Sequence, residues 1–320
     1  MMPIEFANPP AIIKPAPKQL LRASSMLQAP YVIRARDLPF ALGIGGSFAA
    51  MIASTPAFRA NAVHFDGTND YLRRGGGLTG AADGKQGILS AWLKFAAAGD
   101  AVNQTLVRGN TGGGTGHFFF QRLADNTFQV LGRTSASSTI LTIISNSTYT
   151  SATGWLHFLS SWNLATGEAW IYVDDGSDLA AGPTLTDNNI DYTLADWSVG
   201  DNLSGSSILG ADCADFYFNS ATHLDLSVEA NRRKFISAAG KPVDLGADGS
   251  TPTGSVPIIF LSGATSTWHT NKGTGGGFTE NGALTDAASS PGDFTPPGDF
   301  TPSLDFSDAR NSQYLPAISF

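Results

Sequence analysis

The sequence has little of several things that mark common protein classes. Cysteine occurs once in 320 residues, as Cys213, so an internal disulfide is excluded and a small buried hydrophobe is the expected role. Charged residues make up 14 % of the chain, against about 25 % in an average soluble domain. Gly, Ser, Thr and Asn take their place. We therefore expect a weakly charged, hydrogen-bonding surface, and stability that comes from the core and from partners.

Glutamate is also scarce, and this bears on catalysis. It is found at four scattered positions: Glu5, Glu168, Glu229 and Glu280. Glycoside hydrolysis needs two carboxyl groups held about 5–9.5 Å apart, and no strand offers such a pair. Asp174 and Asp175 are adjacent, so on a strand they would point to opposite sides. The five histidines lack zinc spacing, and the glycine runs lack the Lys-Ser/Thr of a phosphate loop. The sequence predicts no enzyme activity.

Positive charge is sparse as well. The formal net charge is −8, and the one basic cluster is Arg232-Arg233-Lys234, so a nucleic-acid partner is not expected. Residues 38–53 come after Arg34 and Arg36 in the basic-then-apolar order of a signal peptide. This run contains three glycines and is shorter than the roughly 20 residues that span a bilayer. We interpret it as a buried segment of an assembly, with no membrane partner.

Residues 61–72 carry the clearest structural signal. Val63, Phe65 and Leu72 are apolar, and Asp66-Gly67 can turn the backbone. This pattern predicts a strand, a tight turn and a returning strand.

Short strands separated by Gly, Asn, Asp and Ser continue to about residue 222. Residues 117–122 are expected to pair with 127–131, and 155–162 with 168–173, as hairpins. A single short helix is expected within 225–237, with Asp225 or Ser227 as its N-cap. Such a density of strands predicts an antiparallel sandwich or jelly roll. The other expected strands are 87–95, 104–108, 197–200 and 212–218.

The chain divides into four parts. Residues 1–60 are rich in proline and form an N-terminal arm, 61–238 are the β domain with its closing helix, and 239–290 are a β-hairpin extension. Residues 291–320 begin with the hexapeptide Pro-Gly-Asp-Phe-Thr-Pro twice over and form an extended C-terminal arm. Both arms are expected to contact other subunits. The expected anchors of the C-terminal arm are Phe294, Phe300, Phe306 and Phe320.

Five motifs in order resemble a known family. They are the opening 61–72 segment, Ser90-Ala-Trp-Leu-Lys94, Gly154-Trp-Leu-His-Phe158, Ala169-Trp-Ile-Tyr-Val-Asp174, and 212–218 together with the short helix after it. Together they resemble laminin-G-like, concanavalin A-like jelly-roll domains. The resemblance implies an all-β, antiparallel concanavalin-like jelly-roll sandwich and a repertoire of carbohydrate and surface binding. The continuation over 241–278 resembles the segments that come after such domains in tailed-phage virion proteins.

Two kinds of site are candidates on the rim loops. Sugar binding needs an exposed aromatic ring with planar hydrogen-bonding groups. Trp197 and Trp268 are the tryptophans expected nearest to loops, although core packing is the alternative for each, and Asp201 and Asn202 accompany them. Calcium is the one metal to consider, because it takes oxygen ligands from such loops, and no other cofactor is expected. The calcium candidates are Asp66, Asp125 and Asn126, for which ordinary turn chemistry is the alternative.

The functional expectation combines these parts. The resemblance implies a structural virion protein of a tailed phage, in its tail, fibre or decoration, that displays a jelly roll for host-surface glycan. Its partners would be other virion subunits, and a homo-oligomer, with a trimer favoured, is expected. Two alternatives stay open: a cementing protein without ligand, and a secreted bacterial carbohydrate-binding adhesin.

Overall fold

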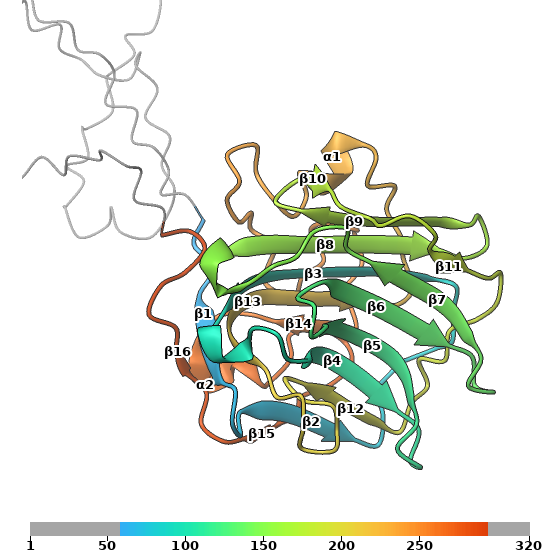
Figure 1. The fold of residues 1–320 in the computed structure, drawn as a ribbon, viewed down its shortest axis with the longest axis horizontal. Coiled ribbons are helices and arrows are strands. Elements are labelled where there is room, and N and C mark those ends of the chain that lie inside the picture. Colours follow the sequence, from blue (N-terminus) through green and yellow to red (C-terminus); the bar gives the residue numbers. More distant parts are fainter. Residues whose placement is uncertain (1–57, 294–320) are drawn as a thin grey trace, which may run out of the picture. The chain divides into compact units, whose positions relative to one another are not determined.

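A computed structural model describes residues 58–293 of the chain. This part is nearly all β: two eight-stranded antiparallel sheets pack against each other (Figure 1). The predicted antiparallel jelly-roll sandwich is therefore confirmed. The predictions for residues 1–57, and for the C-terminal anchors Phe294, Phe300, Phe306 and Phe320, lie outside the described residues.

The first sheet, sheet A, has the strand order β10-β9-β8-β3-β13-β1-β16, and β14 also pairs with β13. Its strands are β1 (Ala62–Asp66), β3 (Gln86–Phe95), β8 (Leu156–Asn163), β9 (Glu168–Val173), β10 (Gly176–Ser177), β13 (Gly210–Asn219), β14 (Ile259–Leu261) and β16 (Thr285–Asp286).

The second sheet, sheet B, has the order β11-β7-β6-β5-β4-β12-β2-β15. Its strands are β2 (Tyr71–Gly75), β4 (Gln104–Asn110), β5 (Gly116–Arg122), β6 (Phe128–Arg133), β7 (Thr139–Ile144), β11 (Thr184–Leu185), β12 (Asp196–Val199) and β15 (Thr279–Asn281). The short helical turns are η3 (Ala97–Gly99), η4 (Ser151–Thr153), α1 (Glu229–Arg232) and α2 (Thr265–Trp268).

The opening strand–turn–strand exists, but its two strands do not form a hairpin. β1 pairs with β13 and β16, whereas β2 pairs with β12 and β15 in the other sheet. The carboxylate of Asp66 accepts hydrogen bonds from the backbone N–H groups of Thr68 and Asn69 and so fixes the turn. The connection crosses from sheet A to sheet B. It does so because strands far away in the sequence pair with both edges of β1 and of β2.

The hairpins β5–β6 and β8–β9 form as predicted. Residues 239–290 differ from the predicted β-hairpin extension. β14 joins β13, β15 joins β2 and β16 joins β1, so this segment adds strands to both sheets. Its strands complete the sandwich because the edges that they cover would otherwise expose unpaired backbone groups.

The core lies between the sheets and is aromatic at its centre. Phe118 of β5 stacks on Phe218 of β13 across the sandwich, with ring centroids 4.8 Å apart, and Trp162 and Trp197 pack beside them. Each fully buried side chain of this size contributes roughly 1.5–3 kcal/mol. Cys213 is buried in this core, as predicted, and its burial raises the pKa of the thiol.

The predicted helix is a single turn. α1 begins after Val228 without a side-chain cap, and Asp225 instead accepts a hydrogen bond from the Ser227 N–H. The turn is held to sheet A by Arg232 and Arg233, which both form ion pairs with Asp175. Among residues 58–293, no helix has the length and apolar character that a membrane span requires.

Candidate ligand-binding face

One row of residues crosses all eight strands of sheet B on the side that faces away from the core. Residues directly opposite each other in paired strands share one face of a sheet. In β4 and β12 the neighbouring residues Val107, Trp197 and Val199 belong to the core, so the row itself points outward. We call it the outer row; in strand order it reads Thr279, Arg73, Ser198, Arg108, Phe119, Leu131, Thr142 and Thr184.

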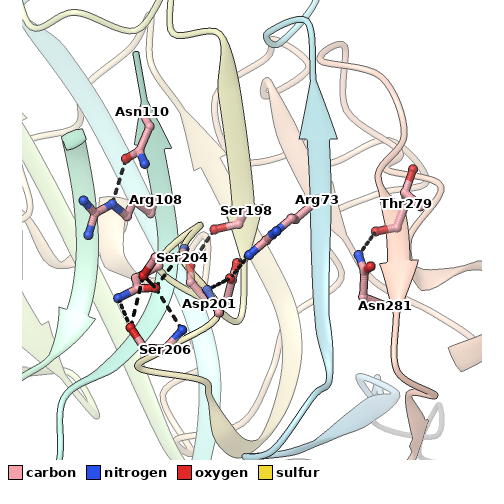
Figure 2. Close-up of polar contacts among 11 residues, drawn as sticks. Arg73, Arg108, Asn110, Ser198, Asp201, Ser204, Ser206, Thr279 and Asn281 are labelled. Atoms are coloured by element: carbon pink, nitrogen blue, oxygen red, sulfur yellow. Dashed lines mark hydrogen bonds and ion pairs between the residues drawn. The ribbon is translucent and has the colours of Figure 1, made fainter. Parts of the chain in front are cut away.

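The first arginine of the outer row is fixed by a buried carboxylate. Asp201 is fully buried, and Nη2 of Arg73 donates to its Oδ2 over 2.5 Å (Figure 2). This hydrogen bond, set against burial, raises the pKa of Arg73. The guanidinium also lies over the ring of Tyr71, 4.5 Å from its centroid. The Ser198 hydroxyl donates to the Asp201 carbonyl, so the loop after β12 is tied onto the face.

The tip of that loop is organised by Asn202. Its Oδ1 accepts hydrogen bonds from the backbone N–H groups of Ser204 and Ser206, and its Nδ2 donates to the Ser206 hydroxyl. The structure thus brings the predicted Asp201 and Asn202 to the border of the outer row. Asp201 pairs with Arg73 of β2 and accepts the Gly205 N–H, and the side chain of Asn202 bonds within the loop. Their role as ligand-binding residues stays a prediction.

Beside this loop, the guanidinium groups of two arginines lie over one aromatic ring. The Arg108 guanidinium lies 4.4 Å from the ring centroid of Phe119, and that of Arg133 lies 5.5 Å from the same centroid. Nε of Arg108 donates to Asn110 Oδ1 over 2.7 Å, and Nη1 of Arg133 donates to the carbonyl of Gly116 over 2.7 Å. We call Arg108, Phe119 and Arg133 the arginine–phenylalanine stack.

The stack concentrates positive charge on an acidic chain. Neither of its arginines forms an ion pair with a carboxylate of residues 58–293. Burial, and then the charge of Arg133, lowers the pKa of Arg108, whereas Asp201 raises it. Arg108 remains charged because a guanidinium does not lose its proton in proteins. An anionic or hydroxyl-rich ligand could therefore accept the donors that these arginines do not use within the chain.

Polar amides extend the face beyond the stack. Gln121 and Gln129 are opposite each other on β5 and β6, and Nε2 of Gln121 donates to Oε1 of Gln129 over 2.8 Å. The face therefore combines planar guanidinium and amide groups with Leu131, around a Phe119 ring of which 8 % is exposed. Such a mixture suits hydroxyl-bearing ligands with one apolar side.

The two tryptophans predicted as sugar platforms do not serve that purpose. Trp197 is 0 % exposed and packs against Phe118 and Phe218, and Trp268 is 1 % exposed and meets Phe65 edge-on. An exposed ring is therefore wrong at both positions, and the alternative, core packing, is confirmed, because both side chains belong to the hydrophobic core.

The three calcium candidates are occupied by turn chemistry. Asp125 accepts hydrogen bonds from the hydroxyl and N–H of Thr127, which lower its pKa, and Asn126 accepts one from the Ala101 N–H. Asp66 caps the β1–β2 turn. Within residues 58–293 there is no group of three or more His, Cys, Asp or Glu side chains placed to hold a metal ion. The arrangement gives calcium no cluster of carboxylates at these positions.

The stack was missed at the level of sequence, although a signal for it exists. Phe118, Phe119 and Phe120 are consecutive, and alternation along a strand forces the middle ring to the opposite face from the other two. Phe119 is 8 % exposed on the outer face, whereas its neighbours are in the core. A similar alternation places Arg108 outside between Val107 and Gly109.

Comparison with known proteins gives structural likeness only. No family model and no curated protein matches the chain. A SAP-like pentraxin from Limulus polyphemus is 15 % identical, with a TM-score of 0.40, over 52 % of this chain and 79 % of its own. A candidate carbohydrate binding protein from Bacteroides ovatus is 12 % identical, with a TM-score of 0.47, over 73 % and 62 %. The LG1-3 region of the laminin alpha2 chain is 13 % identical, with a TM-score of 0.37, over 53 % and 33 %. The chain thus spans less than two thirds of the length of the last two.

Proposed function

We propose that the jelly roll binds glycan on its outer sheet B face and that the chain is a structural component of a tailed-phage virion. The observation that carries the binding proposal is the arginine–phenylalanine stack. Two guanidinium groups without carboxylate partners among the described residues present planar donors close to one ring. Hydroxyl and carboxylate oxygens of sugars are the acceptors that such donors recognise, and Arg–carboxylate contacts can be bidentate.

The loop after β12 supports this proposal by keeping the face rigid. Arg73 is held by Asp201 and Tyr71, so the border of the face is set before a ligand arrives. A preformed polar face loses little conformational freedom on binding. Because Arg108 and Arg133 have no carboxylate partner among the described residues, glycans that carry carboxylates should bind more tightly than neutral ones.

The test is a glycan array probed with the full chain in multivalent form. We expect retention of uronic- or sialic-acid-bearing glycans, reduced about tenfold or more by Arg108→Gln or Arg133→Gln. Lys85→Gln is the matched control, because it removes one positive charge that pairs with Asp187 outside the outer row. If Lys85→Gln lost as much glycan retention as the arginine variants, or if the wild type retained no glycan, the cementing role would replace glycan binding.

The virion assignment rests on the sequence. It is motivated by the resemblance of residues 241–278 to segments of tailed-phage virion proteins and by the proline-rich and duplicated terminal segments. We expect the protein in purified particles, detected by immunogold labelling. Its presence instead in a bacterial culture supernatant, free of particles, would favour the secreted adhesin.

A further inference from the structure

A second candidate site lies on sheet A, at an irregularity in its central strand. β13 is flanked on one side by β3 and on the other by two strands in succession (Figure 1). β1 pairs with β13 up to Ala214, and β14 begins its pairing at Phe216. Asp215 falls between them, at a register shift relative to β3 and with a φ of 46°. This is a β-bulge, which commonly redirects a side chain out of the regular sheet.

The bulge places a carboxylate where nothing in the described chain satisfies it. Asp215 is 4 % exposed, and its side chain forms no hydrogen bond or ion pair with any residue of 58–293. Burying an ionised carboxylate without partners is costly, so buried charges are normally paired. The carboxylate oxygens of Asp215 are not among the fully enclosed atoms that lack a partner, so they keep contact with solvent, and its positive φ is one that Asp adopts more readily than most residues.

Asp215 lines a half-open pocket with a volume of about 370 Å³. A second carboxylate, Asp244, lines it too, and Phe260 and Phe58 add aromatic surface. Lys272 is also there, but its Nζ donates to the Ser262 hydroxyl over 2.9 Å and lies 5.8 Å from the Phe260 ring centroid. The lysine is therefore anchored on the wall and forms no ion pair with Asp215.

The charges around the pocket leave an excess of acid. Burial raises the pKa of Asp215 to about 7, Lys272 opposes that rise, and Asp244 adds to it. Arg59 also lines the pocket, but it pairs with Asp293. The lining thus holds two carboxylates and one ammonium group: Lys272 donates to a hydroxyl, and Asp244 is exposed and accepts the backbone N–H of Gly246. A monovalent cation would relieve the repulsion between Asp215 and Asp244, whereas the nearby Lys272 disfavours a divalent metal.

We propose that this pocket binds a small organic cation, an alkylammonium or alkylguanidinium group, with Asp215 as its principal hydrogen-bond acceptor. Charge-assisted hydrogen bonds of this kind are about twice as strong as neutral ones. Phe58, which is 37 % exposed, offers a ring for cation–π contact to the same group, whereas the ring of Phe260 is buried and already lies near the Lys272 ammonium. The pocket volume is at the low end of small-molecule sites, which suits a ligand of this size.

The experiment is isothermal titration of the full chain with n-butylammonium and n-butylguanidinium, with calcium chloride and N-acetylglucosamine as contrasts. We expect binding of one or both cations, tighter near pH 8 than near pH 6 because the acceptor must be ionised. Asp215→Asn should weaken the affinity about tenfold or more, since the amide cannot pair with a cation. Asp187→Asn is the control, because it removes an exposed carboxylate that pairs with Lys85.

Each other outcome would overturn the proposal. Binding of calcium or of the sugar with no response to either cation would assign the pocket to a different ligand class. Equal affinity in Asp215→Asn and the wild type would place the cation elsewhere. No response to any of the four probes would leave Asp215 as a buried acid without a ligand. A thermal melt of Asp215→Asn checks that the variant is folded, and Asn tolerates the positive φ at this position.

Discussion

At the scale of single residues, Asp215 and His157 make sheet A sensitive to pH in opposite directions. His157 is buried, with Ser90 Oγ 2.9 Å from its Nε2 and the ring of Trp92 packed against it. Burial lowers the pKa of His157 to about 3, although Asp175 acts against that shift. Asp215 should therefore favour the folded state at acid pH, whereas His157 should favour it at neutral pH.

We expect Asp215→Asn to be more stable than the wild type near pH 8, and the gap to shrink or close near pH 4. Because the folded-state pKa of Asp215 is raised from 3.8 to about 7, the folded chain binds the proton more tightly than the unfolded chain. Stability from this group is full at acid pH and is lost as the pH rises through 7, at about 1.4 kcal/mol per pKa unit. Urea unfolding of both proteins across this range measures it. A gap independent of pH would show that Asp215 does not titrate in this window.

His157 should act in the other sense. Its folded-state pKa lies below the ordinary 6.5, so the unfolded chain takes up the proton first as the pH falls. Stability from His157 is present above about pH 6.5 and is lost toward pH 3. In His157→Gln this acid-dependent part of the unfolding free energy should disappear. A wild type and variant with parallel pH profiles between these values would contradict the argument.

At the scale of elements, the loop after β12 depends on one ion pair. Asp201→Ala removes the carboxylate that holds Arg73 and accepts the N–H of Gly205. Arg73 is partly exposed and can turn to solvent, so the loss should be about 1–3 kcal/mol, below that of a fully buried pair. Denaturant unfolding gives the value, with Asp187→Ala as the matched removal of an exposed ion pair. A loss no larger than the control's would mean that the loop is held by its other contacts.

A glycine positions the arginine–phenylalanine stack. A Cβ on Gly116 would come within 2.2 Å of Phe119 Cζ and 2.8 Å of Arg108 Nη2. Gly116→Ala should therefore push the ring and the guanidinium apart and weaken glycan binding several-fold. Gly112→Ala in the preceding loop is the control, since its Cβ would meet one atom at 3.9 Å. Glycan retention of both variants on the array measures the effect. If Gly116→Ala retained as much glycan as Gly112→Ala, the stack would not be the contact surface.

The sequence could predict elements better than it could predict their neighbours. The alternation within 117–122 and 155–162 marks strands, and short loops settle their hairpins. β1 and β2 flank an equally tight turn, yet their partners come from residues 210–214 and 196–199. Trp197 had two interpretations for the same reason. Whether its ring points into the core depends on the register with β2 and β4, which no local pattern encodes.

At the scale of the whole molecule, the two candidate sites lie on separate sheets. The arginine–phenylalanine stack belongs to sheet B, and Asp215 belongs to sheet A. Substitutions at sites on different sheets, with no shared partners, usually change stability or binding independently. Glycan binding should therefore be unchanged in Asp215→Asn, and cation binding unchanged in Arg108→Gln. Coupling between the two would require a path through the core that links Phe118 and Phe218.

Weak single sites can serve attachment when several copies act together. An open sheet face without a deep cleft is expected to bind one glycan weakly, and linking several copies multiplies the residence time without new contacts. If the terminal arms assemble the chain into oligomers, deleting residues 1–55 should leave a folded β domain, because the two sheets and their core lie within 58–293. That truncation should be smaller by light scattering, should keep its single-site affinity by titration, and should lose retention on a glycan-coated surface. Full retention by a monomeric truncation would show that avidity through the N-terminal arm is not needed.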